Sequence, residues 1–252
     1  MCDIFALSAG VNYTAQQYLP IFAEKGKQNM NGWGIGFYRD NQALVEKSAE
    51  RVYDSEQVHE SFQRLARVVD SRIIVSHISC PLSGGGHSAQ NHPFSLSFLN
   101  HVWLFVHIGL IKGIKNYQTT NEPRIDVDVY PARVFEYLRD QLMCYLRYTP
   151  YESIARSLEK SIRNLLSDYP GHYSFVLANE SVFFAFSNFR TLMLLKESAR
   201  YGNSLVLTTI GEGLSDNEWI AIEPEKETLG KLLVVAGPDV LYLGNVTQEA
   251  FL

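Results

Sequence analysis

Two groups of short β-like segments, separated by a pair of adjacent helix patterns, constrain the fold of this chain more than any other feature. The first group runs from residue 2 to about residue 113, and the second begins beyond Gly171. Short apolar runs bounded by turn residues are typical of strands that pair antiparallel with their neighbours. Sheets packed against each other and covered by helices explain this pattern. We therefore expect an α+β layered sandwich with mostly antiparallel sheets, formed by residues 1–252 as a single domain.

The helix pair is indicated by apolar side chains at helical spacing. Residues 131–148 carry the stripe Val134, Leu138, Leu142 and Leu146, and residues 151–167 carry Ile154, Leu158, Ile162, Leu165 and Leu166. Two shorter helices are predicted earlier, one after a Thr14 cap and shortened or kinked by Pro20, and one over about 55–69. Asp40-Asn41 and Asn179-Glu180 predict hairpin turns.

Composition argues against several classes of protein. The chain has 252 residues, of which 46% are hydrophobic and 19% charged, enough to bury a substantial core. A net charge of −5, with Lys and Arg scattered singly, argues against nucleic-acid binding. No apolar run approaches the roughly 20 residues of a membrane span, and the N-terminus lacks the features of a signal peptide. We expect a cytoplasmic protein.

Cys2 is the first candidate for chemistry. The three cysteines, Cys2, Cys80 and Cys144, form no CxxC pair, so we expect free thiols. Removal of Met1 would make Cys2 the N-terminal residue, with a nucleophilic thiolate and an α-amine of reference pKa about 7.7–8.0 that can act as general base. The alternative is that Cys2 is only a small apolar residue opening a strand.

Glycines and histidines give weaker signals. Gly34 and Gly36 interrupt a strand pattern, which indicates the close approach of another backbone or of a ligand. The long loop CPLSGGGHSAQNHPF lacks the Lys-Ser or Lys-Thr of a phosphate-binding loop, so flexibility explains its glycines better. Five histidines, His77, His87, His92, His101 and His107, follow no metal-ligand spacing, and we expect no metal and no other cofactor.

Several stretches resemble, in order and spacing, the class II glutamine amidotransferases. They are MCDIFALSAG, NGWGIGFY, IVSHIS, SAQNHPF, WLFVHIGLI and a mid-chain acidic segment. The branch that looks most similar is the small stand-alone YafJ-like type. The resemblance implies the four-layer αββα sandwich of the N-terminal nucleophile hydrolases, in agreement with the layers expected above.

The resemblance also implies roles for individual residues. Cys2 matches the nucleophile whose thiolate attacks the side-chain amide of glutamine, releasing ammonia and leaving a thioester. Gly109 matches the glycine whose backbone N–H stabilises the oxyanion. The implied substrate-binding residues are Gly32, Trp33 and Gly34 in one loop and Asp128, less securely Asp126, for the α-ammonium group. The implied partners are glutamine or a related small amide and an acceptor or synthase subunit, and an oligomer is compatible with them.

Two positions depart from the family pattern. Ser79 stands where the family has an arginine for the glutamine α-carboxylate, and Ile108 stands where it has an asparagine that donates to the oxyanion. A single hydroxyl replaces a bidentate donor at the first position. Losing one oxyanion donor typically costs a factor of about 10² to 10³ in rate. We therefore expect weak ordinary glutaminase activity, unless Arg72 or Arg124 reaches the pocket.

Three functions remain open from the sequence. The first is an amidotransferase or glutaminase, hydrolase or transferase, that passes ammonia to an unknown acceptor. The second is a catalytically impaired amidotransferase-like module with a binding or complex-assembly role. The third is an amide hydrolase whose substrate lacks an α-carboxylate, for which Ser79 would be suitable. Whether the chain is an enzyme depends on exposure of Cys2 as the N-terminal residue.

Overall fold

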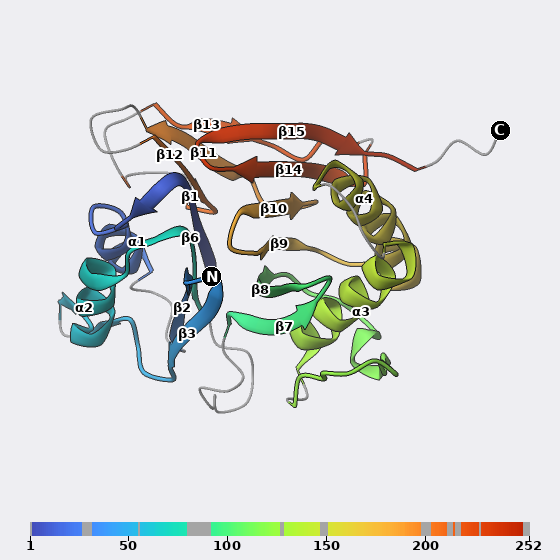
Figure 1. Cartoon of the computed structure of the whole chain (residues 1–252), viewed down its shortest axis with the longest axis horizontal. Coiled ribbons are helices and arrows are strands. Elements are labelled where there is room, and N and C mark those ends of the chain that lie inside the picture. Colours follow the sequence, from blue (N-terminus) through green and yellow to red (C-terminus); the bar gives the residue numbers. More distant parts are fainter. Residues whose placement is uncertain are drawn as a thin grey trace.

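Two sheets lie face to face in the computed structural model, and each carries a pair of helices on its outer side (Figure 1). The helices are α1 (Leu19–Lys25) and α2 (Glu60–Val68) on one sheet and α3 (Tyr130–Tyr145) and α4 (Tyr151–Asp168) on the other. The structure describes residues 2–26, 32–54, 56–79, 92–126, 129–146, 151–197, 203–210, 214, 218–226 and 228–248. The four layers confirm the predicted αββα sandwich.

The first sheet places the N-terminal strand at its centre. Its order is β13-β11-β12-β1-β6-β2-β3, and each described pair of neighbours is antiparallel. Its strands are β1 (Asp3–Tyr13), β2 (Trp33–Arg39), β3 (Gln42–Ser48), β6 (Ser71–Ile78), β11 (Leu192–Glu197), β12 (Ser204–Thr208) and β13 (Ile220–Ile222). Because Cys2 directly precedes β1, it lies at one end of this sheet with β12 and β6 on either side.

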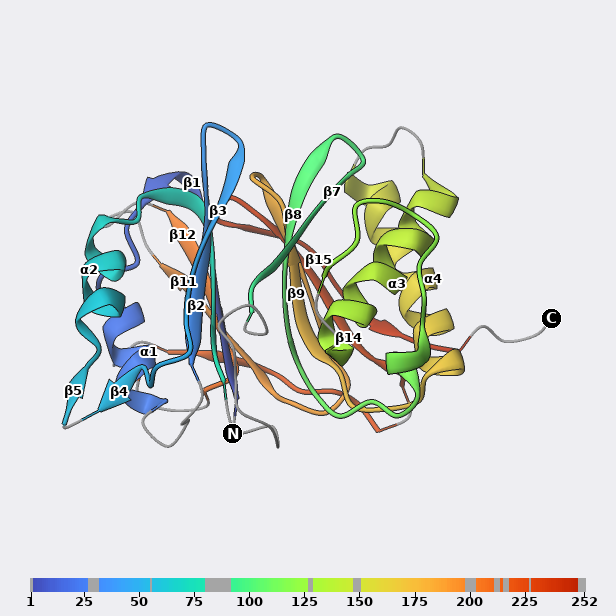
Figure 2. The ribbon, with the colours of Figure 1, turned by 90° about the horizontal axis from the view of Figure 1, so that it is seen from below.

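The second sheet has the order β15-β14-β10-β9-β8-β7 and faces the first (Figure 2). Its strands are β7 (Phe94–Phe98), β8 (His101–Ile108), β9 (Ser174–Ala178), β10 (Val182–Ser187), β14 (Gly230–Ala236) and β15 (Asp239–Val246). A small hairpin of β4 (Tyr53–Asp54) and β5 (Gln57–Val58) and a 3₁₀ turn (Ile114–Asn116) complete the described elements. The strands predicted beyond Gly171 are present as β9 to β15.

Three apolar layers hold the sandwich together. Alternate side chains of a strand point to opposite faces of its sheet. In β1, Ile4 therefore packs between the two sheets, and Phe5 packs under α1 and α2. In β8, Leu104 faces the other sheet while Phe105 faces α3. Burial on both faces explains why these strands read as nearly continuous apolar runs.

The predicted turns and helices agree with the structure in most places. Asp40 and Asn41 have φ of 51° and 60°, which confirms the hairpin turn between β2 and β3. The second hairpin, between β9 and β10, is also confirmed. The two long helices are confirmed within a few residues of the predicted bounds. The described part of the chain contains no helix that is both long and apolar enough to cross a membrane.

Two predictions about helix starts were wrong. Thr14 does not cap α1, which begins at Leu19 with Tyr18 as N-cap, because Pro20 fits the first turn, where its fixed φ and missing N–H cost nothing. The helix expected from residue 55 begins only at Glu60. The residues before it form β5, and His59 caps the helix by accepting a hydrogen bond at Nδ1 from Ser61 N.

Candidate functional site

The candidate site lies where β1 begins beside the end of β6. Asp3 pairs with Ile78 and Ile4 with His77, so the next pair outward is Cys2 and Ser79. The side chain of Cys2 is buried and belongs to the apolar layer between the two sheets. Ser79 is also buried, and its Oγ lies 3.3 Å from Nδ1 of His77. Cys2, the candidate nucleophile, and Ser79, one of the two departures from the family pattern, are therefore neighbours.

Gly32 adjoins Ser79 on its other side, whereas Trp33 and Gly34 belong to β2 and not to a loop as expected, because they pair with Ile78 and His77 of β6. The backbone N–H of Ser79 donates to the carbonyl oxygen of Gly32 at 3.0 Å. Gly32 has a φ of 71°, a left-handed conformation that favours glycine. The side chain of Trp33 faces the helix layer, where its ring meets Phe62 edge-on at 5.2 Å. Trp33 can thus contribute its backbone, but not its indole, to the space beside Cys2.

The backbone of residues 92–93 explains the glycines of β2. A Cβ atom at Gly34 would lie 2.0 Å from the carbonyl oxygen of His92 and 2.9 Å from Cδ of Pro93. At Gly36 it would lie 2.9 Å from a methyl carbon of Leu104 on the opposing sheet. The prediction that another backbone approaches these glycines closely is therefore confirmed at Gly34.

Gly109 lies at the corresponding end of the second sheet, directly after β8. Its φ is 152°, and a Cβ atom there would lie 1.7 Å from the carbonyl oxygen of His172, so no other residue fits. The hydroxyl of Tyr130 donates to the Gly109 carbonyl oxygen at 2.7 Å. Ile108, one residue earlier, is buried in the same inter-sheet layer as Cys2 and offers no hydrogen-bond donor from its side chain.

Three buried histidines, His77, His92 and His107, lie close together near the ends of β6 and β8. The rings of His77 and His92 lie 4.3 Å apart, and His107 is close enough to both for their charges to interact. Burial lowers the pKa of His77 and of His107 to about 3 and also lowers that of His92, so all three are neutral near pH 7. Cys2 also shares the inter-sheet layer with Ile108, the residue before Gly109, so Cys2, Ser79 and Gly109 lie at one edge of the sandwich.

These histidines form no metal site in the described chain. Groups of three or more His, Cys, Asp or Glu side chains suitable for a metal ion are absent among the described residues. His101 instead pairs with Glu180, with Nδ1 and Oε1 2.7 Å apart. His87, Cys80 and the Gly84–Gly86 stretch lie outside the described residues.

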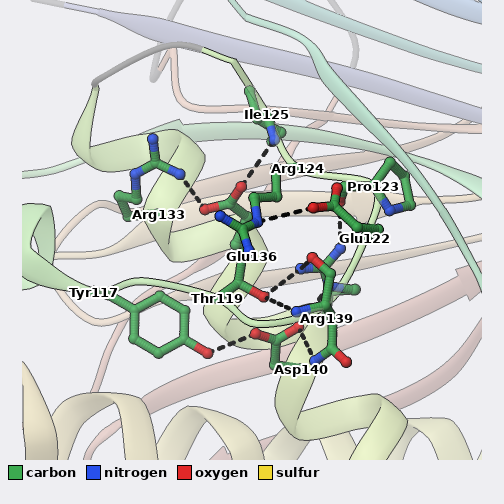
Figure 3. A network of polar contacts seen from close by, with 11 residues as sticks. Tyr117, Thr119, Glu122, Pro123, Arg124, Ile125, Arg133, Glu136, Arg139 and Asp140 are labelled. Atoms are coloured by element: carbon green, nitrogen blue, oxygen red, sulfur yellow. Dashed lines mark hydrogen bonds and ion pairs between the residues drawn. The ribbon is translucent and has the colours of Figure 1, made fainter.

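The structure describes one of the two acidic residues expected at the pocket. Asp126 is exposed, and Asp128 lies outside the described residues. A buried polar network holds the segment that leads to them (Figure 3). Fully buried Arg139 donates to the carbonyl of Pro123 and to Oγ1 of Thr119, while Glu136 accepts from the backbone N–H of Ile125 at 2.8 Å and pairs with Arg133. The network anchors residues 119–125 to α3.

Of the two arginines considered as substitutes, Arg72 does not reach the site. Arg72 is the second residue of β6 and is exposed. At about 3.3 Å per residue along the strand, it lies about 23 Å from Ser79. Arg124 is half exposed and pairs with Glu122 at 3.1 Å.

A different arginine, which sequence reasoning missed, lies beside the start of β1. Nη2 of Arg190 donates to Oδ1 of Asp3 at 3.2 Å and to the carbonyl of Thr209 at 3.0 Å. Thr209 also donates to Asp3 and accepts from the backbone N–H of Ile4. No motif could have indicated this contact, because Arg190 and Asp3 are 187 residues apart and meet only through the sheet order.

Comparison with known proteins agrees with this geometry. Residues 1–208 match the family model for class II glutamine amidotransferases. An uncharacterized protein of Methanocaldococcus jannaschii is 23% identical over 208 residues, which are 80% of this chain and 56% of that protein. The chain thus spans little more than half the length of the curated relative it matches.

Solved structures show the same fold at low sequence identity. A predicted glutamine amidotransferase from Pseudomonas aeruginosa has a TM-score of 0.65 at 16% identity, with 96% of this chain and all of that chain covered. A glutamine aminotransferase class-II domain protein from Silicibacter pomeroyi has a TM-score of 0.58 at 13% identity, with 97% and 100% covered. Glutamine phosphoribosylpyrophosphate amidotransferase of B. subtilis has a TM-score of 0.63 at 14% identity, with 98% of this chain and 50% of that chain covered.

The fold is that of the N-terminal nucleophile amidotransferases. The match over residues 1–208 is more specific, and the chain belongs to the class II glutamine amidotransferase family.

Proposed function

We propose that this protein releases ammonia from the side-chain amide of glutamine, with Cys2 as an N-terminal nucleophile, and passes the ammonia to an acceptor. The observation that carries this proposal is that Cys2 adjoins Ser79 and shares the inter-sheet layer with Ile108, the residue before Gly109. Family membership supports glutamine as the class of substrate. The acceptor and any synthase subunit are left open by the same observations.

The proposed reaction uses only groups of this chain and a water molecule. After removal of Met1, the Cys2 amine takes the thiol proton and the thiolate adds to the amide carbon of glutamine. The Gly109 N–H donates to the oxygen that becomes negative. The C–N bond then breaks, ammonia leaves with the proton returned by the ammonium group, and a thioester remains. Addition of water to the thioester yields glutamate and restores the thiol.

The roles of the remaining residues follow from their places. Gly32 and Gly34 line the edge beside Ser79 with backbone, and the lack of a side chain at Gly34 admits the backbone of residues 92–93. Asp128, or less securely Asp126, is proposed to bind the α-ammonium group. The Ser79 hydroxyl is proposed to contribute one hydrogen bond to the substrate.

One observation favours a second candidate function. Ile108 fills the inter-sheet layer beside the candidate oxyanion site and leaves the Gly109 N–H without a neighbouring side-chain donor at this position. A site with one donor fewer is expected to be slower by about 10² to 10³. The second candidate is therefore a catalytically impaired module that binds an amide substrate or assembles with a partner.

Ammonia release from glutamine by purified protein tests the proposal, with intact mass first establishing that Met1 is absent. Turnover that Cys2→Ala abolishes and Cys144→Ala preserves would support it, since Cys144 is an exposed thiol on α3. A protein made in its native host that retains Met1, or a Met1-free protein whose activity survives Cys2→Ala, would contradict it.

A further inference from the structure

Arg190 is held in place by contacts that leave one amino group of its guanidinium without a hydrogen-bond partner among the described residues. It lies in the connection from β10 to β11, in a turn organised by Ser187. The Ser187 Oγ accepts from the backbone N–H of Arg190 at 3.0 Å and donates to its carbonyl at 2.6 Å. From this turn the side chain reaches Asp3, and Nη2 makes both hydrogen bonds described above. The orientation of the guanidinium is thereby determined.

The second amino group, Nη1, is buried and has no hydrogen-bond partner among the described residues. Buried polar groups are nearly always satisfied, and a charged donor left unsatisfied costs more than a neutral one. A guanidinium with one amino group on a carboxylate and the other unoccupied is suited to a second anion, because its donors form a planar fork.

The turn that carries Arg190 adjoins the candidate site. Phe189 packs against the inter-sheet layer that contains Cys2 and Ile108. Its ring also stacks on His172 at 5.0 Å, and the carbonyl of His172 lies against Gly109. Arg190 therefore approaches the site from the β12 side of β1, opposite to Ser79.

Lys47 is another cation near this edge. It pairs across the strands with Gly34, and its Nζ lies 5.0 Å from the centre of the Phe94 ring. Burial lowers its pKa to about 8, so it is largely protonated at pH 7. Lys47 belongs to the sheet row of His77, however, two residues further from the strand ends than Ser79.

We propose that Arg190 receives the carboxylate of the amide substrate through Nη1, so that Asp3 and the substrate share one guanidinium. The inference rests on the proposed function for the identity of the substrate. It makes Arg190 the specificity-determining residue for an α-carboxylate, a role that Ser79, with its single hydroxyl, performs poorly.

Two amides that differ only in the carboxylate test the proposal. Glutamine carries it, and 4-aminobutanamide is the same molecule without it. We expect Arg190→Gln to lower kcat/KM for glutamine by about 10- to 100-fold more than for 4-aminobutanamide, the usual effect of a lost hydrogen bond to a charged group. A smaller loss that both amides share is expected from the contact of Arg190 with Asp3. Arg190→Lys should restore part of the preference. Arg163→Gln is the matched control, because Arg163 is similarly exposed and pairs with Glu159 on α4, away from the site.

Two outcomes would overturn the assignment. An equal loss for both amides would mean that Arg190 acts only by holding Asp3 and the start of β1. A selective loss on glutamine in Lys47→Met, with Arg190→Gln unaffected in its preference, would assign the carboxylate to Lys47.

A binding measurement separates this inference from the proposed reaction. Calorimetric titration of Met1-free Cys2→Ser protein with glutamate requires no turnover. Binding that Arg190→Gln weakens about 10-fold or more supports the inference even if the unaltered protein hydrolyses neither amide, a result that would defeat the proposed function alone. Absence of glutamate binding, or binding that is equal in both proteins, would defeat the inference.

Discussion

The hydroxyl of Tyr130 donates a 2.7 Å hydrogen bond to the carbonyl oxygen of Gly109, joining the first turn of α3 to the end of β8. Gly109 is the residue proposed to stabilise the oxyanion, and its position leaves no room for a side chain. The helix layer therefore fixes the orientation of a peptide at the edge where the two sheets meet. Tyr130 is a positioning residue in this arrangement.

Tyr130→Phe should lower kcat for ammonia release by about tenfold, less than the 10² to 10³ that loss of a donor costs, because the Gly109 N–H itself remains. Unfolding free energy should fall by about 1 kcal/mol, the usual contribution of one hydrogen bond. Steady-state kinetics and urea unfolding check both values. Tyr173→Phe, which removes the hydroxyl bonded to the Tyr169 carbonyl, is the control and should affect stability alone.

Cys2 should be the most reactive thiol of the Met1-free protein. A neighbouring ammonium group favours the thiolate, and Arg190 neutralises the Asp3 carboxylate beside it. Peptide mapping of iodoacetamide labelling across about pH 6 to 9, which brackets the reference values of thiol and amine, measures the rates. Slower labelling of Cys2 than of exposed Cys144 over the whole range would argue for an apolar, structural Cys2.

Ser79→Arg combined with Ile108→Asn should raise glutamine hydrolysis by at least about 10² to 10³, the value of one oxyanion donor, and Cys2→Ala should abolish the gain. The structure adds a cost. Ile108 is buried between the sheets, so the asparagine introduced by Ile108→Asn places a polar amide there and should lower stability by about 1–3 kcal/mol. Ammonia release and thermal unfolding are to be measured on the same samples.

Two results for this double replacement would contradict the prediction. A folded, Met1-free double variant without any gain would mean that the pocket differs at more than these two positions. High activity in the unaltered protein would mean that another donor already serves, and Arg190 is the one to examine first.

Acid should destabilise the protein through its buried histidines. The folded-state pKa of His77 and His107 is about 3, below the unfolded reference of about 6.5, so the unfolded chain binds more protons between these values. Stability is fully present above about pH 6.5 and is lost as the pH falls toward 3, by up to about 1.4 kcal/mol per pH unit for each histidine.

His107→Phe should reduce this acid slope by one proton at little cost in stability. Both ring nitrogens of His107 are buried without a hydrogen-bond partner among the described residues, and its ring already stacks on Phe105. Urea midpoints at several pH values from 7 to about 4 measure the slope. His101→Gln, at a partly exposed ion pair, is the comparison. An unchanged slope in His107→Phe would mean that His107 is already protonated in the folded state.

Arg139→Met should destabilise the protein by about 3–5 kcal/mol, because it leaves Asp140 and the carbonyl of Pro123 without their buried cationic partner. The loss should be accompanied by faster proteolysis around residues 119–125, which this network attaches to α3. Arg156→Met on α4 provides a control outside the network. A stability change below about 1 kcal/mol at Arg139 would contradict the proposed anchoring.

Local patterns in the sequence predicted the layered fold and most of its elements. Periodicity located both long helices, and turn residues located the hairpins at Asp40-Asn41 and Asn179-Glu180, because these signals are local and repeat with the geometry of the element. The order of short motifs indicated the family. Gly34 also correctly indicated a close backbone contact, because a residue without a side chain can be recognised from the sequence alone.

The surroundings of Cys2 could not be predicted from such patterns and follow from the way the strands assemble. The strand register placed Ser79 beside Cys2, the packing of the two sheets brought Ile108 and Gly109 to the same edge, and the sheet order placed Arg190 there from 187 residues away. It also placed Arg72 at the far end of its strand. The physical reason is that strand pairing joins distant segments through backbone hydrogen bonds that are the same for every residue, so no side chain in the sequence records which partner it will meet.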